Sequence, residues 1–261
     1  MHRDSRDRGL KPWVKVVRNL ASMLVVIAAV FLLSCQSLVR SALFYPTHVA
    51  DDKGLTRWMH GATLIGFARP VAEPENVWLL LHGNGGQASD RVYLLKKFSE
   101  RDALFILEYP GYGTRPGTPS RKSFDAAALE AYQVLRAQFP GKPVCVVTES
   151  IGSGPGYTLA RAAQPPDKLV LIVPFDVLKS VAHEHVPYLP TSLMLAGSWD
   201  NIESLAAYGG PIEVFGAERD PVIPVEHARK LAASRPQATF HLVPGGHMDW
   251  VDQPEVLIHN P

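Results

Sequence analysis

Ser150 stands where a valine-rich run gives way to small residues, in the stretch VVTESIGSGPG at residues 146–156. A serine at such a boundary is typical of a nucleophile on a sharp strand-to-helix turn, whose usual signature is G-x-S-x-G. Thr148 occupies the place of the first glycine. Taken alone, the motif leaves two interpretations open: a nucleophilic serine, or a polar residue in a glycine-rich loop.

A carboxylate and a histidine that could assist this serine follow later in the chain. Asp220 lies in GAERDPVIP, and His247 lies in VPGGHMDW. A free serine hydroxyl is a poor nucleophile near neutral pH, so it needs a histidine that takes its proton and an acid that orients the histidine. The three residues therefore become a catalytic candidate only if the fold brings them together.

Short β-branched runs alternate with helical stretches over most of the chain after residue 76. The predicted strands are 76–83, 103–109, 143–149, 167–175, 211–217 and 238–247. The predicted helices are 87–101, 120–139, 151–164 and 225–234, with a final short helix at 248–259. This alternation predicts a mostly parallel sheet with helices on both faces, and residues 54–61 and 62–71 are expected to add an antiparallel edge.

Polar residues follow the predicted strands at their C-terminal ends, where functional groups gather in a parallel α/β sheet. HGNGG follows the first strand, EYPGYG follows the second, and Ser150, Asp220 and His247 follow later ones. Residues 176–210 interrupt the alternation. They are expected to form either a small lid over the site or a longer crossover.

Five of these motifs, HGNGG, EYPGYG, SIGSG, GAERDPVIP and PGGH, resemble the α/β-hydrolase superfamily. The resemblance covers roughly residues 43–250 and points to the Bem46-like branch, with its ABHD13- and ABHD17-type serine hydrolases. The order Ser, Asp, His along the chain agrees with that superfamily. The resemblance implies an α/β-hydrolase fold with a short lid. Haloalkane and epoxide chemistry is disfavoured, because those relatives carry aspartate at the nucleophile position.

Each candidate then has an expected role. Ser150 would attack a carbonyl carbon and form an acyl-enzyme. His247 would take the serine proton and return it to the leaving group. Asp220 would accept the other ring N–H of His247 and hold its tautomer.

Backbone donors for the oxyanion are expected on both sides of the serine. Ile151 directly follows the nucleophile at the start of a helix, whose dipole favours negative charge. The second donor is expected from Asn84, with Gly85 as the alternative, in the loop after the first strand. His82 in the same loop is expected to organise the loop rather than to act as a base.

No cofactor and no metal are expected. No G-x-G-x-x-G follows the first strand, and HGNGG lacks the lysine and serine of a phosphate loop. HEH at 183–185 offers two histidines without a further ligand cluster, so it is interpreted as lid or surface. Cys145 lies in a strand-like run, where a lone cysteine is usually a small buried hydrophobe. The net charge of +1 gives no argument for a nucleic-acid partner.

The first 34 residues differ in kind from the rest. A basic segment at 1–19 precedes the uncharged run LASMLVVIAAVFLL at 20–33, a pattern typical of a secretory signal peptide. LLSCQ at 32–36 resembles a bacterial lipobox, which implies cleavage before Cys35 and a lipid on that cysteine. The expected product is a lipoprotein anchored in a bacterial cell envelope. An uncleaved anchor over 20–39 and a fully released protein are the alternatives.

These observations lead to one main hypothesis and two rivals. The main hypothesis is a membrane-anchored serine hydrolase, formed by residues 35–261, that cleaves carboxylic esters of small or acyl-chain substrates. A thioesterase or peptidase could use the same triad. A non-catalytic binding protein on the same fold is kept open by Thr148, because a fold alone does not establish activity.

Overall fold

The computed structural model describes residues 14, 18–23, 26, 43–195 and 197–258. The chain divides into two units, Met1–Ala42 and Leu43–Pro261, and the described residues of the first unit are helical. Cys35 and most of the predicted signal lie outside the described residues. No helix within the described ranges has the length and hydropathy of a membrane span.

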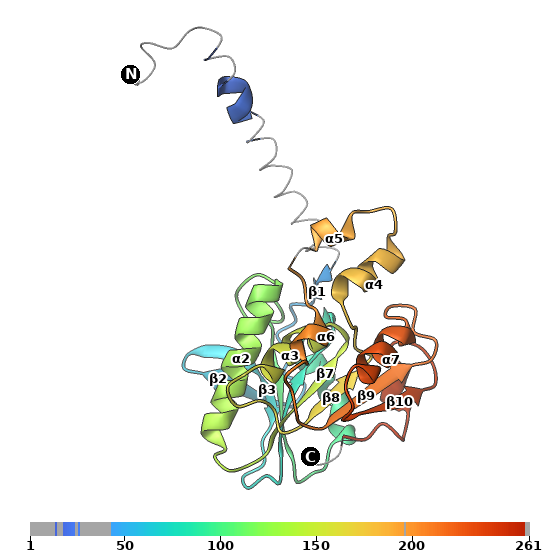
Figure 1. Cartoon of the computed structure of the whole chain (residues 1–261). Helices are drawn as coiled ribbons and strands as arrows, with labels where there is room; N and C mark the ends of the chain where they lie inside the picture. The colour runs from blue at the N-terminus through green and yellow to red at the C-terminus, as the bar shows by residue number, and fades with distance from the viewer. Residues whose placement is uncertain (1–13, 15–17, 24–25, 27–42, 196, 259–261) are drawn as a thin grey trace, which may run out of the picture. The chain divides into compact units, whose positions relative to one another are not determined.

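Eight strands form the central sheet of the second unit (Figure 1). They are β2 (Thr56–His60), β3 (Thr63–Arg69), β4 (Val77–Leu81), β6 (Ala103–Leu107), β7 (Val144–Glu149), β8 (Leu169–Ile172), β9 (Ile212–Ala217) and β10 (Ala238–Val243). Their order is β10-β9-β8-β7-β4-β6-β3-β2, and the pairs from β10 through β6 are parallel. Strand β3 runs antiparallel to both β6 and β2. The predicted mostly parallel sheet with an antiparallel edge is confirmed.

A second, two-stranded sheet was not predicted. Strand β1 (Tyr45–Pro46) pairs in parallel with β5 (Gly85–Gly86), which lies in the HGNGG loop after β4. The Thr47 N–H extends this pairing by donating to the Gly86 carbonyl at 3.0 Å. The first residues of the unit are therefore tied to a loop that the sequence assigns to the site.

Helices cover both faces of the sheet, as predicted. They are α2 (Arg121–Gln138), α3 (Ser153–Ala160), α4 (Leu178–His185), α5 (Thr191–Met194), α6 (Asn201–Ser204) and α7 (Val225–Ala233), with 3₁₀ helices η2 (Ala88–Lys97), η3 (Ser150–Gly152) and η4 (Asp249–Asp252). Helices α2, α3 and α7 contribute to one core, whereas η2 and η4 contribute to the other. Strand β4 is buried along its whole length, because alternate side chains enter the two cores.

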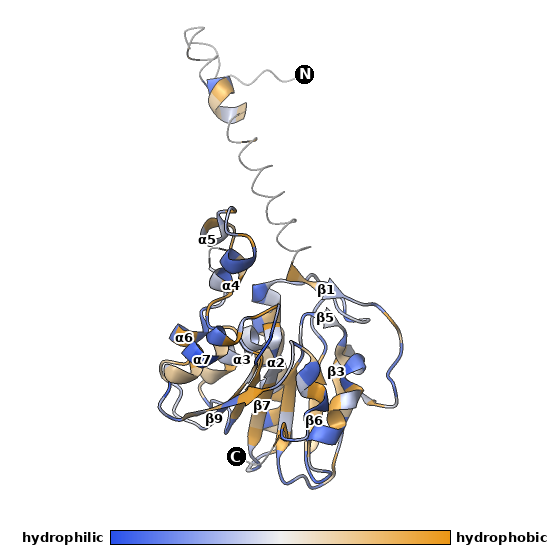
Figure 2. Cartoon of the chain, turned by 90° about the vertical axis from the view of Figure 1, so that its right-hand side faces the viewer, coloured by the Kyte–Doolittle hydropathy of each residue, from blue (hydrophilic) through white to orange (hydrophobic). Residues whose placement is uncertain are grey.

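Figure 2 shows apolar residues along the strands β6, β7 and β9 of the sheet. Cys145 in β7 is fully buried, as predicted for a small hydrophobe, and burial raises the pKa of its thiol to about 12. A thiol with this pKa stays protonated and unreactive at neutral pH.

Two predicted helices take a different form. Residues 88–97 form a 3₁₀ helix, and Ala88, Arg91, Leu94 and Lys97 are buried at intervals of three, which matches three residues per turn. Of the predicted 248–259 helix, the described residues 248–258 form only the short η4. Pro254 explains this end, because a proline disfavours the helical conformation of the residue before it.

Candidate active site

Ser150 lies on a sharp turn between β7 and α3. Its φ is +53°, in the left-handed region that residues other than glycine seldom adopt, so the turn is strained. The Ser153 hydroxyl donates to the Ser150 carbonyl at 2.8 Å and helps to hold the turn. Gly152 is needed two residues after the serine, because a Cβ there would overlap the Leu81 carbonyl oxygen. The strand, the turn and the helix thus present Ser150 at the C-terminal end of β7.

Thr148, which departs from the usual motif, fits the turn through a second glycine. A Cβ added to Gly156 would overlap the Cγ2 methyl of Thr148. The methyl group therefore fills the space that a side chain on α3 would need, and α3 approaches the strand over Gly156. The Thr148 hydroxyl is buried and finds no hydrogen-bond partner among the described residues. The threonine in place of the usual glycine is therefore accommodated by Gly156, which lies on α3 six residues after Ser150.

The fold brings the three predicted site residues together. His247 Nε2 lies 3.0 Å from Ser150 Oγ, and His247 Nδ1 lies 2.7 Å from Asp220 Oδ2. The carboxylate beside Nδ1 assigns the proton to that nitrogen, so Nε2 is free to accept the serine proton. Both contacts lie within the range required of a nucleophile, its base and the group that orients the base.

The acid and the base are each held by backbone contacts. Asp220 Oδ1 accepts the N–H groups of Val222 and Ile223, both at 2.8 Å, which leaves Oδ2 for His247. The His247 loop is closed by Asp249, whose Oδ2 accepts the Gly246 N–H at 2.7 Å. The Asp220 side chain is 1 % exposed and that of His247 is 14 % exposed, so only the base reaches toward solvent.

The loop after β4 has a fixed peptide orientation next to Asn84. The Gly83 carbonyl faces His82 Nδ1 at 2.7 Å, and the Tyr112 hydroxyl donates to the Asn84 carbonyl at 2.9 Å. In a trans peptide the C=O and N–H point to opposite sides, so the His82 contact directs the Asn84 N–H away from His82. His82 thus contacts its own loop, in keeping with its predicted role. The pairing of Asn84 with Ile151 as an oxyanion hole stays a prediction.

Sequence reasoning missed a buried ion pair beside the serine. Glu149 Oε2 lies 3.0 Å from Arg91 Nε, and both side chains are almost fully buried. Glu149 is the residue directly before Ser150 and ends the otherwise uncharged strand β7. A carboxylate in an apolar strand was the available signal, because a buried charge needs a partner.

A second buried cluster lies beyond β8. Asp176 Oδ1 is 2.6 Å from His227 Nδ1, and Asp176 Oδ2 is 2.7 Å from Lys230 Nζ. Burial alone would raise the pKa of Asp176, but the hydrogen bonds from His227 and Lys230 hold it lower, at about 2. The hydrogen bond to Asp176, together with the Glu184 carboxylate 3.2 Å from Nε2, raises the pKa of His227.

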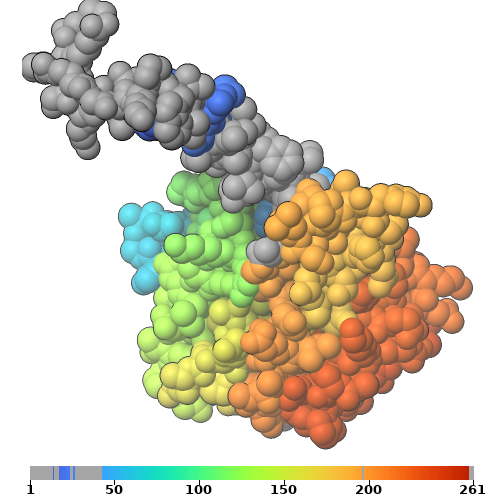
Figure 3. Space-filling model, turned by 45° about the horizontal axis from the view of Figure 1, so that its top comes forward, coloured from blue at the N-terminus to red at the C-terminus, as the bar shows by residue number. Residues whose placement is uncertain are grey.

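Residues 176–210 hold the short helices α4, α5 and α6 (Figure 1), and the yellow-to-orange atoms of this part of the chain lie on the surface in Figure 3. The function of this interval as a lid stays a prediction. The HEH motif lies at the end of α4 and makes protein contacts. Glu184 reaches His227, and His185 Nε2 lies 2.8 Å from the Val222 carbonyl, next to the Asp220 loop. In the part of the chain that is described, no three His, Cys, Asp or Glu side chains are grouped to hold a metal ion.

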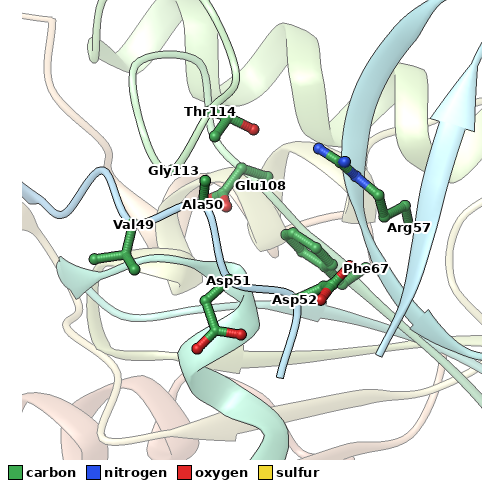
Figure 4. Close-up of a pocket in the computed structure, with 9 residues that line it drawn as sticks. All are labelled: Val49, Ala50, Asp51, Asp52, Arg57, Phe67, Glu108, Gly113 and Thr114. Carbon is green, nitrogen blue, oxygen red and sulfur yellow. The ribbon is translucent and has the colours of Figure 1, made fainter. Parts of the chain in front are cut away.

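A small cavity of about 50 Å³ lies behind the loop that follows β6 (Figure 4). Its lining includes Asp52, Arg57 and Glu108 but neither the serine nor its two partners. Glu108 Oε1 lies 3.7 Å from His82 Nε2, beyond hydrogen-bonding distance. The cavity therefore lies next to residues that pack against the loop after β4, and it is not the place where an ester would bind to react with Ser150.

Distant relatives are found among curated proteins. An uncharacterised protein of Mycobacterium tuberculosis is 32% identical over 184 residues, which cover 69% of this chain and 64% of that protein. Lysophosphatidylserine lipase ABHD12 of Macaca fascicularis is 29% identical over 181 residues, which cover 62% of this chain and 46% of the lipase. The chain thus spans about half to two thirds of the length of these relatives. No protein-family model matches it.

Solved structures with the same architecture include two hydrolases. Esterase Pf2001 of Pyrococcus furiosus matches with a TM-score of 0.60 at 14% identity, over 78% of this chain and 90% of the esterase. An alpha-beta hydrolase from Vibrio vulnificus matches with a TM-score of 0.59 at 19% identity, over 74% of each chain. The chain has the α/β-hydrolase fold, as predicted. Of the two curated relatives, the one with a functional name is ABHD12, so the finer resemblance to the Bem46-like ABHD13 and ABHD17 types stays a prediction.

Proposed function

We propose that this protein is a serine hydrolase that cleaves carboxylic esters through an acyl-enzyme. The observation that carries the proposal is the contact chain from Ser150 Oγ through His247 to Asp220, on a strained turn at the C-terminal end of β7. A structural serine would need neither the strain nor a histidine whose second nitrogen faces a buried carboxylate. The distant similarity to ABHD12 lipases supports the same chemistry.

The reaction would proceed in two halves. Ser150 Oγ attacks the ester carbonyl carbon while its proton passes to His247 Nε2, and collapse of the tetrahedral intermediate expels the alcohol with that proton. Water then attacks the acyl-enzyme, again giving its proton to His247, and the acid leaves as Ser150 recovers its proton. Asp220 stabilises the imidazolium in both halves. The Ile151 and Asn84 N–H groups are proposed to bind the oxyanion, where loss of one donor typically costs about 2.7–4 kcal/mol.

The proposed substrate is a lipid ester with one acyl chain. The support is the name of the ABHD12 relatives, which are lysophosphatidylserine lipases. Membrane attachment through Cys35, or through an uncleaved anchor, is proposed from the sequence pattern of residues 1–36. Incorporation of labelled palmitate that is lost in Cys35→Ala would test the lipoprotein; an unlabelled wild type would leave the uncleaved anchor and the released protein as the alternatives.

The rival binding-protein hypothesis rested on Thr148 disturbing the turn. Because Gly156 makes room for the Thr148 methyl, the turn keeps its strained φ and the contact to His247, and this support for the rival weakens. Ester and thioester cleavage share every step above, so the two are separated by comparing rates on matched substrates.

A fluorophosphonate probe tests the proposal without knowledge of the natural substrate. We expect the wild type to be labelled, Ser150→Ala to be unlabelled, and the matched control Ser234→Ala, in a remote helix end, to be labelled at the wild-type rate. Hydrolysis of short p-nitrophenyl esters should follow the same pattern. A folded wild type without labelling, or labelling that persists in Ser150→Ala, would remove Ser150 from the mechanism.

A further inference from the structure

We propose that the buried pair Arg91–Glu149 positions the oxyanion loop, defined as residues 83–86, and so acts in the reaction without touching the substrate. The inference rests on the proposed function and deepens it. Glu149 directly precedes Ser150 on β7, whereas Arg91 lies on η2, directly after the loop. The pair therefore joins the nucleophile strand to the loop that is expected to supply the second oxyanion donor.

The carboxylate holds the beginning of the loop. Glu149 Oε2 accepts the Gly83 N–H at 3.1 Å and the Arg91 Nε–H at 3.0 Å. The fit at Gly83 is close, since a Cβ there would lie 2.9 Å from Glu149 Oε1. Glycine at this position is thus explained by the carboxylate that packs against it.

The guanidinium holds the end of the loop. Arg91 Nη2 donates to the Gly85 carbonyl at 2.9 Å. Gly86 is fitted to the same group, because a Cβ there would lie 2.9 Å from Arg91 Nη1. Two glycines of HGNGG therefore make room for the ion pair, whereas a Cβ on Gly85 would meet open space.

Asn84 lies between these two attachments. The Gly83 N–H is fixed by Glu149, the Gly85 carbonyl is fixed by Arg91, and the Asn84 carbonyl accepts the Tyr112 hydroxyl. His82 holds the peptide that bears the Asn84 N–H, through the Gly83 carbonyl. With the peptide groups on both sides held as well, the Asn84 N–H keeps one direction without reorganisation during the reaction. Fixed donors of this kind are worth more than mobile ones, because no energy is spent on orienting them as charge develops.

The geometry favours positioning over a merely stabilising role. A buried ion pair is weak evidence for stability, because apolar side chains of similar volume often serve as well or better. Arginine also offers several donors in a rigid fork, and this one divides them between a carboxylate and a backbone carbonyl. A pair that served stability alone would not need the contact to Gly85.

Arg91→Lys separates the two roles. A lysine keeps a positive charge beside Glu149, but one ammonium cannot reproduce both the Nε contact and the Nη2 contact. We expect kcat on a p-nitrophenyl ester to fall about 10- to 100-fold with KM changed less than about threefold. Affinity for a trifluoromethyl ketone, which forms an oxyanion on Ser150, should fall by the same factor as kcat/KM.

Two further variants complete the design. Arg91→Met should lower kcat at least as much as Arg91→Lys, and Glu149→Gln, whose amide oxygen can still accept the Gly83 N–H, should lower it less. Lys168→Met is the matched control, because it removes a buried cation that lies 2.7 Å from Glu213 and precedes β8, away from the loop. We expect that control to lose stability while kcat stays within about threefold of the wild type.

The outcomes distinguish this inference from the proposed function. If folded Arg91→Lys keeps the wild-type kcat and ketone affinity, or if Lys168→Met loses as much kcat, the positioning role is wrong although Ser150 is still labelled. If Arg91→Met does not fold, Arg91→Lys and Glu149→Gln decide the question. An unlabelled wild type would instead refute the proposed function itself.

Discussion

Two flanks of the sheet meet at Ser150, and they are built differently. The oxyanion flank consists of the chain after β4 and β6, whereas the acid flank consists of the chain after β8, β9 and β10. On the oxyanion flank, backbone groups are held by buried side chains, and the cations among them include Arg91 and Arg115. On the acid flank, backbone N–H groups hold Asp220, and the side chains of Asp176, His227 and Lys230 hold one another. His227 is a histidine whose pKa these contacts raise.

The oxyanion flank is closely packed. Tyr109 stacks on Phe124 with ring centroids 3.8 Å apart, and His82 lies 4.5 Å from Tyr109 between ring centroids. Although burial alone lowers the pKa of Arg91, the charge of Glu149 raises it above its ordinary value, so the guanidinium keeps its proton throughout the range in which proteins are stable. The charge of Arg91 should therefore respond little to pH.

The acid flank is more open and holds the 176–210 interval. Tyr188 is 98% exposed and Leu193 is 77% exposed, on the segment that joins or forms α4 and α5. That segment reaches the flank through contacts of partly exposed side chains, Glu184 with His227 and His185 with the Val222 carbonyl. Under the proposed function, the closely packed flank would supply the oxyanion donors, and the more open flank would border the substrate.

Of the changes considered, removal of β1 should disturb the oxyanion flank most and have the largest effect on activity. β1 pairs with β5 inside the oxyanion loop, so a chain that begins at residue 48 lacks the partner that a chain beginning at residue 43 retains. We expect kcat on a p-nitrophenyl ester to fall about 100-fold in the shorter chain, because small misplacements of catalytic groups have effects of this size. Steady-state kinetics on both chains measures the difference.

The shorter chain also loses Phe44, whose ring centroid lies 5.0 Å from that of Phe124. Phe44→Ala in the longer chain is therefore the control, since it removes this packing and leaves β1 in place. It should lower the unfolding midpoint and leave kcat within a few-fold of the longer chain. Equal kcat losses in the control and in the shorter chain would show that packing, and not strand pairing, supports the loop.

Sequence patterns predict these two flanks unequally. Ser150, Asp220 and His247 could be found because each follows a strand with a clear apolar pattern, and parallel strands bring their C-terminal ends to one edge. The contact between Arg91 and Glu149 joins residues 58 apart, and no periodicity encodes it. The contact between Arg91 and Glu149 follows from the pairing of β4 with β7 in the sheet, which the sequence pattern does not specify.

Local geometry was also hard to predict where tertiary contacts decide it. β1 and β5 have two residues each, too few for a β pattern, and β5 consists of two glycines. The apolar spacing of residues 88–97 suits an α-helix as well as a 3₁₀ helix until the burial at every third residue is known. Thr148 was expected to disturb the turn at Ser150, because the residue that leaves room for its methyl group, Gly156, lies on a different element.

The next largest effect is expected when the contact between Thr148 and Gly156, which lies between the two flanks, is disturbed. Gly156→Ala adds a methyl that overlaps Thr148 Cγ2, so we expect a loss of about 1–3 kcal/mol in the free energy of unfolding, the usual cost of overpacking. Thr148→Ser removes that methyl and retains the hydroxyl. Combined with Gly156→Ala, it should recover most of the loss, which urea unfolding of the four proteins measures.

The double variant also tests whether the turn at Ser150 depends on this contact. If α3 shifts in Gly156→Ala, labelling by the fluorophosphonate should slow in that variant and recover in the double variant. Additive losses of stability, without recovery, would mean that the two residues do not share the space that their geometry assigns to them.

The smallest effect on stability is expected from substitution of His227. This effect should depend on pH, because His227 titrates. Asp176 and Glu184 raise the pKa of His227 above 6.5, so its contribution to stability is fully present below pH 6.5 and is lost as the pH rises through the folded-state value. Asp176 acts in the opposite sense: its contribution is present above 3.8 and is lost as the pH falls through about 2. The cluster should therefore contribute most between these limits.

His227→Gln removes the titrating group while a side-chain amide can still donate to Asp176. We expect the wild type to exceed His227→Gln in unfolding free energy by about 1 kcal/mol near pH 6, a modest amount because Glu184 and Lys230 are more than half exposed and solvent screens their charges. The difference should shrink toward pH 9 as His227 loses its proton. Urea unfolding at several pH values compares the two. A constant difference for His227→Gln would mean that the titrating group of the acid flank lies elsewhere.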